Sequence, residues 1–421
     1  MVVRASRMQS DDGALAARDR LLPGLAVLLD DERLAGALDE ALPGAWLSAA
    51  RATYVRYKPG TACIVKCRLT LADEQVDAYV RLERESSRNK LTTHARRATA
   101  RSRLGRGAVL LPRLPAALYP CPNDARVAAL PHLVDDSRRR SLLEAALPDS
   151  PALWSSSLRP LRWKPERRFV AALESDQGHR AVVKAYAGTL SAALRAATAL
   201  GGRPSPRMPR RLGHSAASGI VVLEWLPGRP LDGELLVGGA TLAGEALAQL
   251  HALPPLLLPL CTRDDELRRV LQSVETVGWL VPDARGLALR IAQQIARRLP
   301  RVVRPVIAHG DFSADQVLVH EDRAALVDLD EAVLSDPLRD LGRFLATLTR
   351  EVVAGRLTAS AAAVAQAQLL AGYGRVDRAA LRAWTATGLL HLAPEPFRLR
   401  EPDWAARLLE LLAMAEGLLD G

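Results

Sequence analysis

The chain has 421 residues, of which 49% are hydrophobic and 25% are charged, and its formal net charge is +10. This length predicts two or three compact units, and the hydrophobic content excludes a chain that is disordered throughout. No apolar run has the length of a membrane span, because the richest run, residues 253–260, is broken by three prolines.

The basic residues are mostly arginines that are scattered along the chain. Aromatic residues make up only 4%, and no recognition-helix or base-stacking pattern accompanies the arginines. We therefore expect no nucleic-acid partner, and we favour a basic background that helps to bind a small polyanion such as a nucleotide. Since only five basic residues are lysines, each lysine is a candidate for a specific role.

Residues 1–13 are polar and do not resemble a signal peptide. The four cysteines have no second close cysteine pair or histidine pair beside them, which favours reduced thiols over a disulfide or a zinc site. These features predict a cytoplasmic protein without membrane association.

An internal repeat occupies the N-terminal half of the chain. Arg56-Tyr57-Lys58-Pro59 is echoed by Arg162-Trp163-Lys164-Pro165. In each copy an apolar run, a polar turn and a second apolar run follow, and the second runs end in Arg81 and Lys184. Matches in the same order predict duplication of a strand–strand–helix–strand unit. The first copy is expected over 45–136, and a linker around 148–151 predicts units at residues 1–150, 151–230 and 231–421.

The rest of the chain has a helical pattern from Thr241 onward. Leu242, Ala246 and Leu250 form an apolar stripe, and Asp336-Pro337 has the residue types of a helix start. A small β-rich part therefore precedes a mainly helical part, which predicts an α+β fold.

The most informative segment lies at the border of these two parts. Ala308-His309-Gly310-Asp311 precedes Gln316, and two apolar runs around the polar residues 321–323 predict a β-hairpin that ends at Asp328. Pairing of His320 with Ala324 would place Gln316 opposite Asp328, with Asp311 on the turn before the first strand. Two carboxylates and an amide would then share one corner, as a site for a divalent cation and a reacting hydroxyl requires.

These residues resemble the aminoglycoside phosphotransferase and choline kinase-like family, which has a bilobal protein-kinase-like fold. The resemblance rests on His309-Gly310-Asp311 with Gln316, on Asp328, and on Asp336-Pro337 with Asp340-Leu341. Residues 223–230 and 247–254 are similar to the inter-lobe hinge and to the first helix of the large lobe. Residues 1–150 would then be a degenerate, duplicated N-lobe, 151–230 the N-lobe and hinge, and 231–421 the helical C-lobe.

The resemblance implies ATP-dependent phosphoryl transfer to a hydroxyl of a small molecule such as a sugar, an aminoglycoside or an amino alcohol. Asp311 would orient or deprotonate the acceptor, Gln316 and Asp328 would bind Mg²⁺, and Lys184 would contact the nucleotide phosphates. The backbone of Glu224, Trp225 and Leu226 would meet the adenine. Most of the family has asparagine as the metal-binding amide, and Gln316 favours the maltokinase-like branch.

Three alternatives stay open at this point, and the first is the active small-molecule kinase described above. The helix expected over 189–200 has no acidic residue, so the usual lysine–glutamate pair of kinases has no local partner for Lys184. This absence keeps open a pseudokinase, a nucleotide-binding regulatory module without transfer activity. A third alternative is that residues 1–150 dock a protein partner. The acceptor and the oligomeric state are not encoded in any pattern that we identify.

Overall fold

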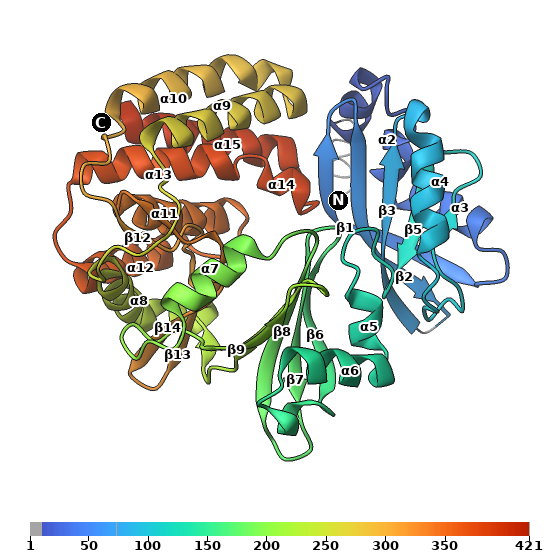
Figure 1. The fold of residues 1–421 in the computed structure, drawn as a ribbon. Coiled ribbons are helices and arrows are strands. Elements are labelled where there is room, and N and C mark those ends of the chain that lie inside the picture. Colours follow the sequence, from blue (N-terminus) through green and yellow to red (C-terminus); the bar gives the residue numbers. More distant parts are fainter. Residues whose placement is uncertain (1–10, 73, 421) are drawn as a thin grey trace. The chain divides into compact units, whose positions relative to one another are not determined.

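The computed structural model describes residues 11–72 and 74–420, so part of the segment considered above as a signal peptide lies outside the described residues (Figure 1). The chain divides into two compact units. The first comprises residues 1–189, 213–222 and 396–404, and the second comprises 190–212, 223–395 and 405–421. The predicted boundaries at residues 150 and 230 stay a prediction.

The first sheet has five strands in the order β1-β2-β3-β5-β4. Its strands are β1 Leu47–Lys58, β2 Ala62–Leu71, β3 Glu74–Glu83, β4 Val109–Leu110 and β5 Ala116–Pro120. Helix α4 Arg88–Arg97 connects β3 to β4, and helices α2 Leu25–Leu28 and α3 Asp31–Ala41 precede the sheet. Val55, Val65 and Val80 pair with one another across β1, β2 and β3 and are all buried, so this row of the sheet lies in the core.

The second sheet repeats this topology, with the order β6-β7-β8-β10-β9. Its strands are β6 Ser157–Lys164, β7 Arg168–Glu174, β8 Arg180–Tyr186, β9 Arg211–Ser215 and β10 Ile220–Glu224. Helix α7 Ser191–Leu200 connects β8 to β9, and helices α5 Leu130–Val134 and α6 Asp136–Ala146 precede the sheet. The predicted duplication is therefore present.

The repeated unit is longer than the sequence matches indicated. Helices α3 and α6 each have 11 residues, and each begins with an aspartate N-cap, Asp30 or Asp135, whose side chain accepts backbone N–H groups. Each copy thus includes a helical pair ahead of its sheet, and α5 and α6 correspond to the helical lead-in of the first copy.

The second unit is mainly helical. Its long helices are α8 Leu236–His251, α9 Arg263–Leu280, α10 Arg285–Arg298, α11 Leu338–Val353, α12 Ala359–Tyr373, α13 Arg378–Leu392 and α15 Trp404–Asp420, and the short α14 Glu395–Arg398 precedes α15. Helices α8 and α12 pack closely, because a Cβ atom on Gly244 would lie only 2.1 Å from the carbonyl oxygen of Leu369. Helix α11 begins where Asp336-Pro337 predicted, and its Phe344 and Leu345 are buried.

Two small sheets complete the second unit. Strands β11 Arg229–Pro230, β13 Val317–His320 and β14 Arg323–Leu326 form one, and β12 Val306–Ala308 pairs with β15 Val333–Ser335 in the other. The architecture confirms the predicted α+β class with an N-terminal module that duplicates the second sheet. Within the described part of the chain, every helix is too short or too polar to cross a bilayer.

Candidate functional site

The turn that carries Asp311 follows strand β12 and is held by the first turns of helix α11. The carboxylate of Asp340 accepts the backbone N–H of His309 at 2.6 Å and that of Gly310 at 3.0 Å. Arg339 donates from Nη1 to the carbonyl oxygen of Gly310 at 3.1 Å. Three hydrogen bonds from the side chains of Asp340 and Arg339 on α11 thus fix the backbone just before Asp311.

Asp340 is completely buried and stays a strong acceptor. Burial by itself would raise the pKa of its carboxyl, but the hydrogen bond and charge of His251 outweigh burial and hold that pKa below its ordinary value. Nε2 of His251 lies 3.2 Å from Oδ2 of Asp340, and Nδ1 lies 2.8 Å from the hydroxyl of Tyr373. This chain of contacts ties α8, α11 and α12 to the turn that carries Asp311.

Asp311 itself forms an ion pair with Arg343, one helical turn beyond Arg339. Nε and Nη2 of Arg343 both donate to Oδ1 of Asp311, at 3.2 and 3.0 Å. The side chain of Asp311 is 42% exposed and that of Arg343 is 28% exposed. In the described part of the chain Oδ2 of Asp311 has no hydrogen-bond partner, so this oxygen can accept a substrate hydroxyl.

The predicted hairpin is present, but the predicted register was wrong by one residue. His320 pairs with Arg323 rather than Ala324, because only Glu321 and Asp322 form the turn and Arg323 already belongs to β14. Glu321 adopts φ 56°, the left-handed conformation that a two-residue hairpin turn requires. Gln316 consequently lies opposite Val327, and its carbonyl oxygen accepts the N–H of Val327 at 3.0 Å.

The main chain of Val327 joins the parts of the site. Its N–H donates to the carbonyl oxygen of Gln316. Its own carbonyl oxygen lies 2.9 Å from Nε2 of the buried His309, which must donate to it. Asp328 follows in the left-handed conformation, with φ 60° and ψ 46°. An aspartate tolerates this conformation better than most residues, and it turns the chain out of the hairpin. The Asp311 turn and the Gln316–Asp328 corner are therefore one connected structure.

Gly310 brings the same two segments together from the other side. It adopts φ 89°, and a Cβ atom at this position would lie 2.0 Å from the carbonyl oxygen of Glu331. Glu331 ends the 3₁₀ turn Leu329–Glu331 that follows Asp328. Only glycine permits this backbone approach, which explains the central residue of the His-Gly-Asp motif.

Gln316 and Asp328 are the residues predicted to bind a metal ion. Gln316 is 6% exposed, and its Nε2 donates to Oδ2 of Asp315 at 3.2 Å. This bond orients the amide and leaves the Oε1 oxygen as the available ligand atom. The described residues contain no group of three or more His, Cys, Asp or Glu side chains that could hold a metal ion. One carboxylate and one amide oxygen fit a Mg²⁺ ion whose other ligands are phosphates and water.

The residues predicted to contact the nucleotide lie in both units. Lys184 belongs to the first unit, on β8 opposite Val170 of β7, and it is 6% exposed. Glu224 ends β10, where its carboxylate binds Arg207 at 2.7 Å and its backbone N–H donates to Arg210 at 2.8 Å. The backbone N–H of Glu224 is therefore already used within the protein.

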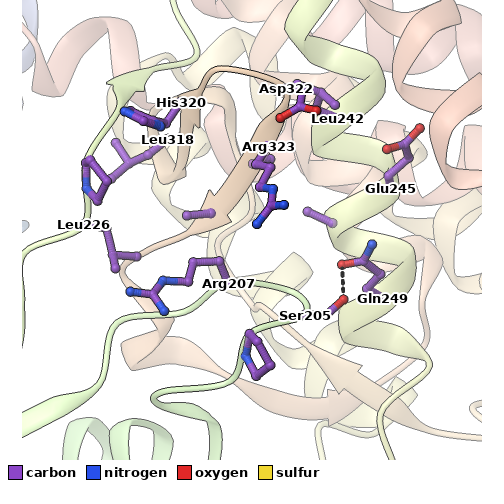
Figure 2. Close-up of a pocket in the computed structure, with 15 residues that line it drawn as sticks. Ser205, Arg207, Leu226, Leu242, Glu245, Gln249, Leu318, His320, Asp322 and Arg323 are labelled. Carbon is purple, nitrogen blue, oxygen red and sulfur yellow. Dashed lines mark hydrogen bonds between the residues drawn. The ribbon is translucent and has the colours of Figure 1, made fainter.

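Trp225 and Leu226 follow in the connector after β10. Leu226 is buried and lines a polar cavity of about 580 Å³ with Leu318, Arg207 and Glu245 (Figure 2). Asp311, Gln316 and Asp328 are not part of its lining, so this cavity is not the site of the predicted chemistry.

Arg343 is a functional candidate that the sequence analysis did not identify. The available signal was helical spacing, because Arg339 and Arg343 lie four residues apart on one face of α11 and flank Asp340. The spacing alone could not show that this face meets the Asp311 turn.

A family model described as the phosphotransferase enzyme family matches residues 154–386. A search of curated protein sequences found no significant match.

Similar solved structures include an aminoglycoside phosphotransferase from Streptomyces rimosus, with 21% identity, a TM-score of 0.44, and coverage of 62% of this chain and 98% of that chain. A choline/ethanolamine kinase family protein from Mesorhizobium loti has 18% identity, a TM-score of 0.46, and coverage of 68% and 95%. A choline kinase from Cryptosporidium parvum has 11% identity, a TM-score of 0.48, and coverage of 68% and 97%.

The maltokinase-like branch suggested by Gln316 stays a prediction, because the matches do not single out a branch. The family model spans more than half of the chain and includes every predicted catalytic and metal-binding residue. The chain belongs to the phosphotransferase enzyme family.

Proposed function

We propose that this protein transfers the γ-phosphoryl group of ATP to a hydroxyl of a small molecule, with Asp311 as the catalytic carboxylate. The observation that carries the proposal is the junction at Val327. Its main chain bonds His309 at 2.9 Å and Gln316 at 3.0 Å, so the catalytic turn and the metal-binding corner hold a fixed relation.

Phosphoryl transfer needs positioning and charge neutralisation more than covalent chemistry. Asp311 would hold the acceptor hydroxyl through Oδ2 and take its proton, while Arg343 keeps the carboxylate in one orientation through Oδ1. A carboxylate that is fixed in this way loses less entropy when the acceptor binds.

Gln316 and Asp328 would hold Mg²⁺, which when bound neutralises phosphate charge. The left-handed backbone of Asp328 supports a functional role, since uncommon backbone conformations concentrate at such sites. Lys184 would contact the phosphates, and the connector at Glu224, Trp225 and Leu226 would meet the base through backbone groups not already bonded to Arg210.

The acceptor is a small molecule with a free hydroxyl. Family members differ in the acceptor, and specificity depends on pocket shape and a few polar groups. The positive charge of Arg343 beside Asp311 argues against an acceptor with an ammonium group next to its reacting hydroxyl.

The test measures Mg²⁺-dependent ATP turnover with a panel of sugars, aminocyclitols and amino alcohols. We expect turnover with at least one acceptor, and Asp311→Asn should lower kcat by about 10²–10⁴-fold. Asp322→Asn is the matched control, because Asp322 lies on the exposed hairpin turn, and it should behave as the wild type.

Two results would count against the proposal. Turnover that survives Asp311→Asn would refute the catalytic role. Stabilisation by Mg-ATP without turnover on any acceptor would favour the alternative, a nucleotide-binding regulatory module.

A further inference from the structure

The backbone of Arg343 is fixed by close packing of α11 against α13. A Cβ atom on the preceding Gly342 would lie 2.6 Å from the carbonyl carbon of Trp384. A Cβ atom on Gly388 of α13 would lie 2.7 Å from Cβ of Ala346 and 3.5 Å from Cα of Arg343. The two glycines therefore let the helices approach to backbone contact, and the side chain of Arg343 extends from a rigid part of the fold.

The guanidinium of Arg343 has two edges that can each donate two N–H groups to an anion. The side edge is filled, because Nε and Nη2 both donate to Oδ1 of Asp311, at 3.2 and 3.0 Å. The end edge consists of Nη1 and the second N–H of Nη2. In the part of the chain that the structure describes, no acceptor binds Nη1, and the side chain is 28% exposed. The end edge is therefore open to a ligand.

The neighbouring Arg339 is bound to the protein on more than one side. Its Nε lies 3.2 Å from Oε2 of Glu266, its Nη1 donates to the carbonyl oxygen of Gly310 at 3.1 Å, and its side chain is only 14% exposed. Arg339 thus braces the fold from within. Arg343 differs from it because one edge of its guanidinium is bonded to the protein and the other faces the place where an acceptor meets Asp311.

The acids near this turn permit a negative group beside Arg343. Both oxygens of Asp340 accept backbone N–H groups of the turn, and Asp315 accepts N–H and O–H groups from its neighbours. Asp328 is the proposed ligand of Mg²⁺, whose charge opposes its own. An anion at the end edge of Arg343 consequently meets a cation first, whereas an ammonium group there would meet a like charge.

We propose that the end edge of Arg343 binds a carboxylate or phosphate group of the acceptor, so that the acceptor is an anionic hydroxyl compound such as a hydroxy acid or a sugar phosphate. This inference rests on the proposed function and names the class of its acceptor. Arginine matches two oxygens of a carboxylate or phosphate with two parallel N–H groups. Because the same guanidinium holds Oδ1 of Asp311, it aligns the bound anion with Oδ2, which receives the hydroxyl.

In the transfer step the acceptor oxygen forms a bond to the γ-phosphorus of ATP, and the bond between that phosphorus and the bridging oxygen breaks. The electron pair of the broken bond leaves with ADP, and the hydroxyl proton passes to Oδ2 of Asp311. Arg343 takes no part in these bond changes. It determines which acceptors are held within reach of Asp311.

The test measures kcat/KM of the full-length protein for two series of acceptors, each built on one skeleton. Glycerate, glycerol 3-phosphate, glycerol and 3-aminopropane-1,2-diol differ at one end of the molecule. Glucuronate, glucose 6-phosphate, glucose and 6-amino-6-deoxyglucose differ at C6. In the series that is turned over, we expect an anionic member to exceed the neutral one by about 10-fold or more and the ammonium compound to be the poorest acceptor.

Arg343→Gln should reduce the preference for the anionic member to about 2-fold or less. Any loss that comes from releasing Asp311 lowers kcat for every member alike and cancels from this ratio. Arg343→Lys keeps the charge without the paired donors and should recover part of the preference. Arg356→Gln is the matched control, because Arg356 likewise binds one carboxylate, that of Glu351, through Nε and Nη2, and it should keep the wild-type ratio.

A preference for carboxylate over phosphate, or the reverse, supports the inference and identifies the group that the end edge binds. Neutral or ammonium-bearing acceptors that are better substrates than the anionic ones, or an unchanged preference in Arg343→Gln, would overturn the inference while the proposed function stands. Absence of turnover with every acceptor of the panel and of both series would overturn the proposed function and this inference together.

Discussion

Asp340→Asn is expected to loosen the turn that carries Asp311 without changing the shape of the side chain at position 340. The carboxylate accepts His309 through Oδ2 and Gly310 through Oδ1, whereas asparagine has one acceptor oxygen. The backbone N–H of either His309 or Gly310 then loses its acceptor and faces the side-chain NH₂ group of the asparagine. A hydrogen bond to a charged group contributes about 1.5–3 kcal/mol, and an unsatisfied buried donor costs about 1–3 kcal/mol, so we expect the free energy of unfolding to fall by about 3 kcal/mol.

Urea unfolding and steady-state kinetics would measure the two consequences of this change. A shift of Asp311 by about 1 Å should lower kcat by about 10²-fold and change the KM for nucleotide much less. Asp336→Asn is the control, because Asp336 caps α11 through the N–H of Leu338 at 2.8 Å and asparagine caps helices equally well. The reasoning would be refuted if Asp340→Asn lowered the free energy of unfolding by less than about 0.5 kcal/mol, or if both variants lowered it equally.

Two further predictions concern the same region. Burial would raise the pKa of Glu266, but its hydrogen bond with His391 and nearby positive charges lower it from 4.5 to about 2. The charged carboxylate of Glu266 therefore stabilises the fold by about 3 kcal/mol above pH 4.5, and this stabilisation is lost as the pH falls toward 2. Glu266→Gln should consequently flatten the dependence of the free energy of unfolding on pH between pH 2 and 5. Gly310→Ala places a Cβ atom 2.0 Å from the carbonyl oxygen of Glu331. We expect this variant to lose turnover, and its free energy of unfolding should fall by about 2–4 kcal/mol. Gly355→Ala, at φ 72° with open space around it, should cost only about 1 kcal/mol; similar losses in both glycine variants would contradict this explanation.

The site could be predicted from the sequence because its parts lie within twenty residues of one another. Two apolar runs around a polar break specify a hairpin wherever the turn falls, so Gln316 and Asp328 were expected near each other. The register was missed because Glu321 takes a left-handed conformation that glycine or asparagine usually supplies. A turn without these residues gives no signal of its length.

Long-range contacts explain what the sequence did not show. Asp340 meets His251, which is 89 positions away, and Arg343 meets Asp311 across 32 positions. Helical periodicity places Arg339 and Arg343 on one face of α11, but which segment that face contacts depends on packing of the whole unit. The docking of a protein partner through residues 1–150 likewise stays a prediction.

The row of cations in the first copy, Arg56 and Arg81 across β1, β2 and β3, has a structural role. Arg81 stands where the second copy has Lys184, and no His-Gly-Asp segment follows it in its own copy. Its row is filled by the buried carboxylate of Glu166, and removing one partner of a buried ion pair typically costs about 3–5 kcal/mol. A nucleotide would have to displace Glu166 at that cost, so the row of Arg56 and Arg81 in the first copy is a structural ion-pair site.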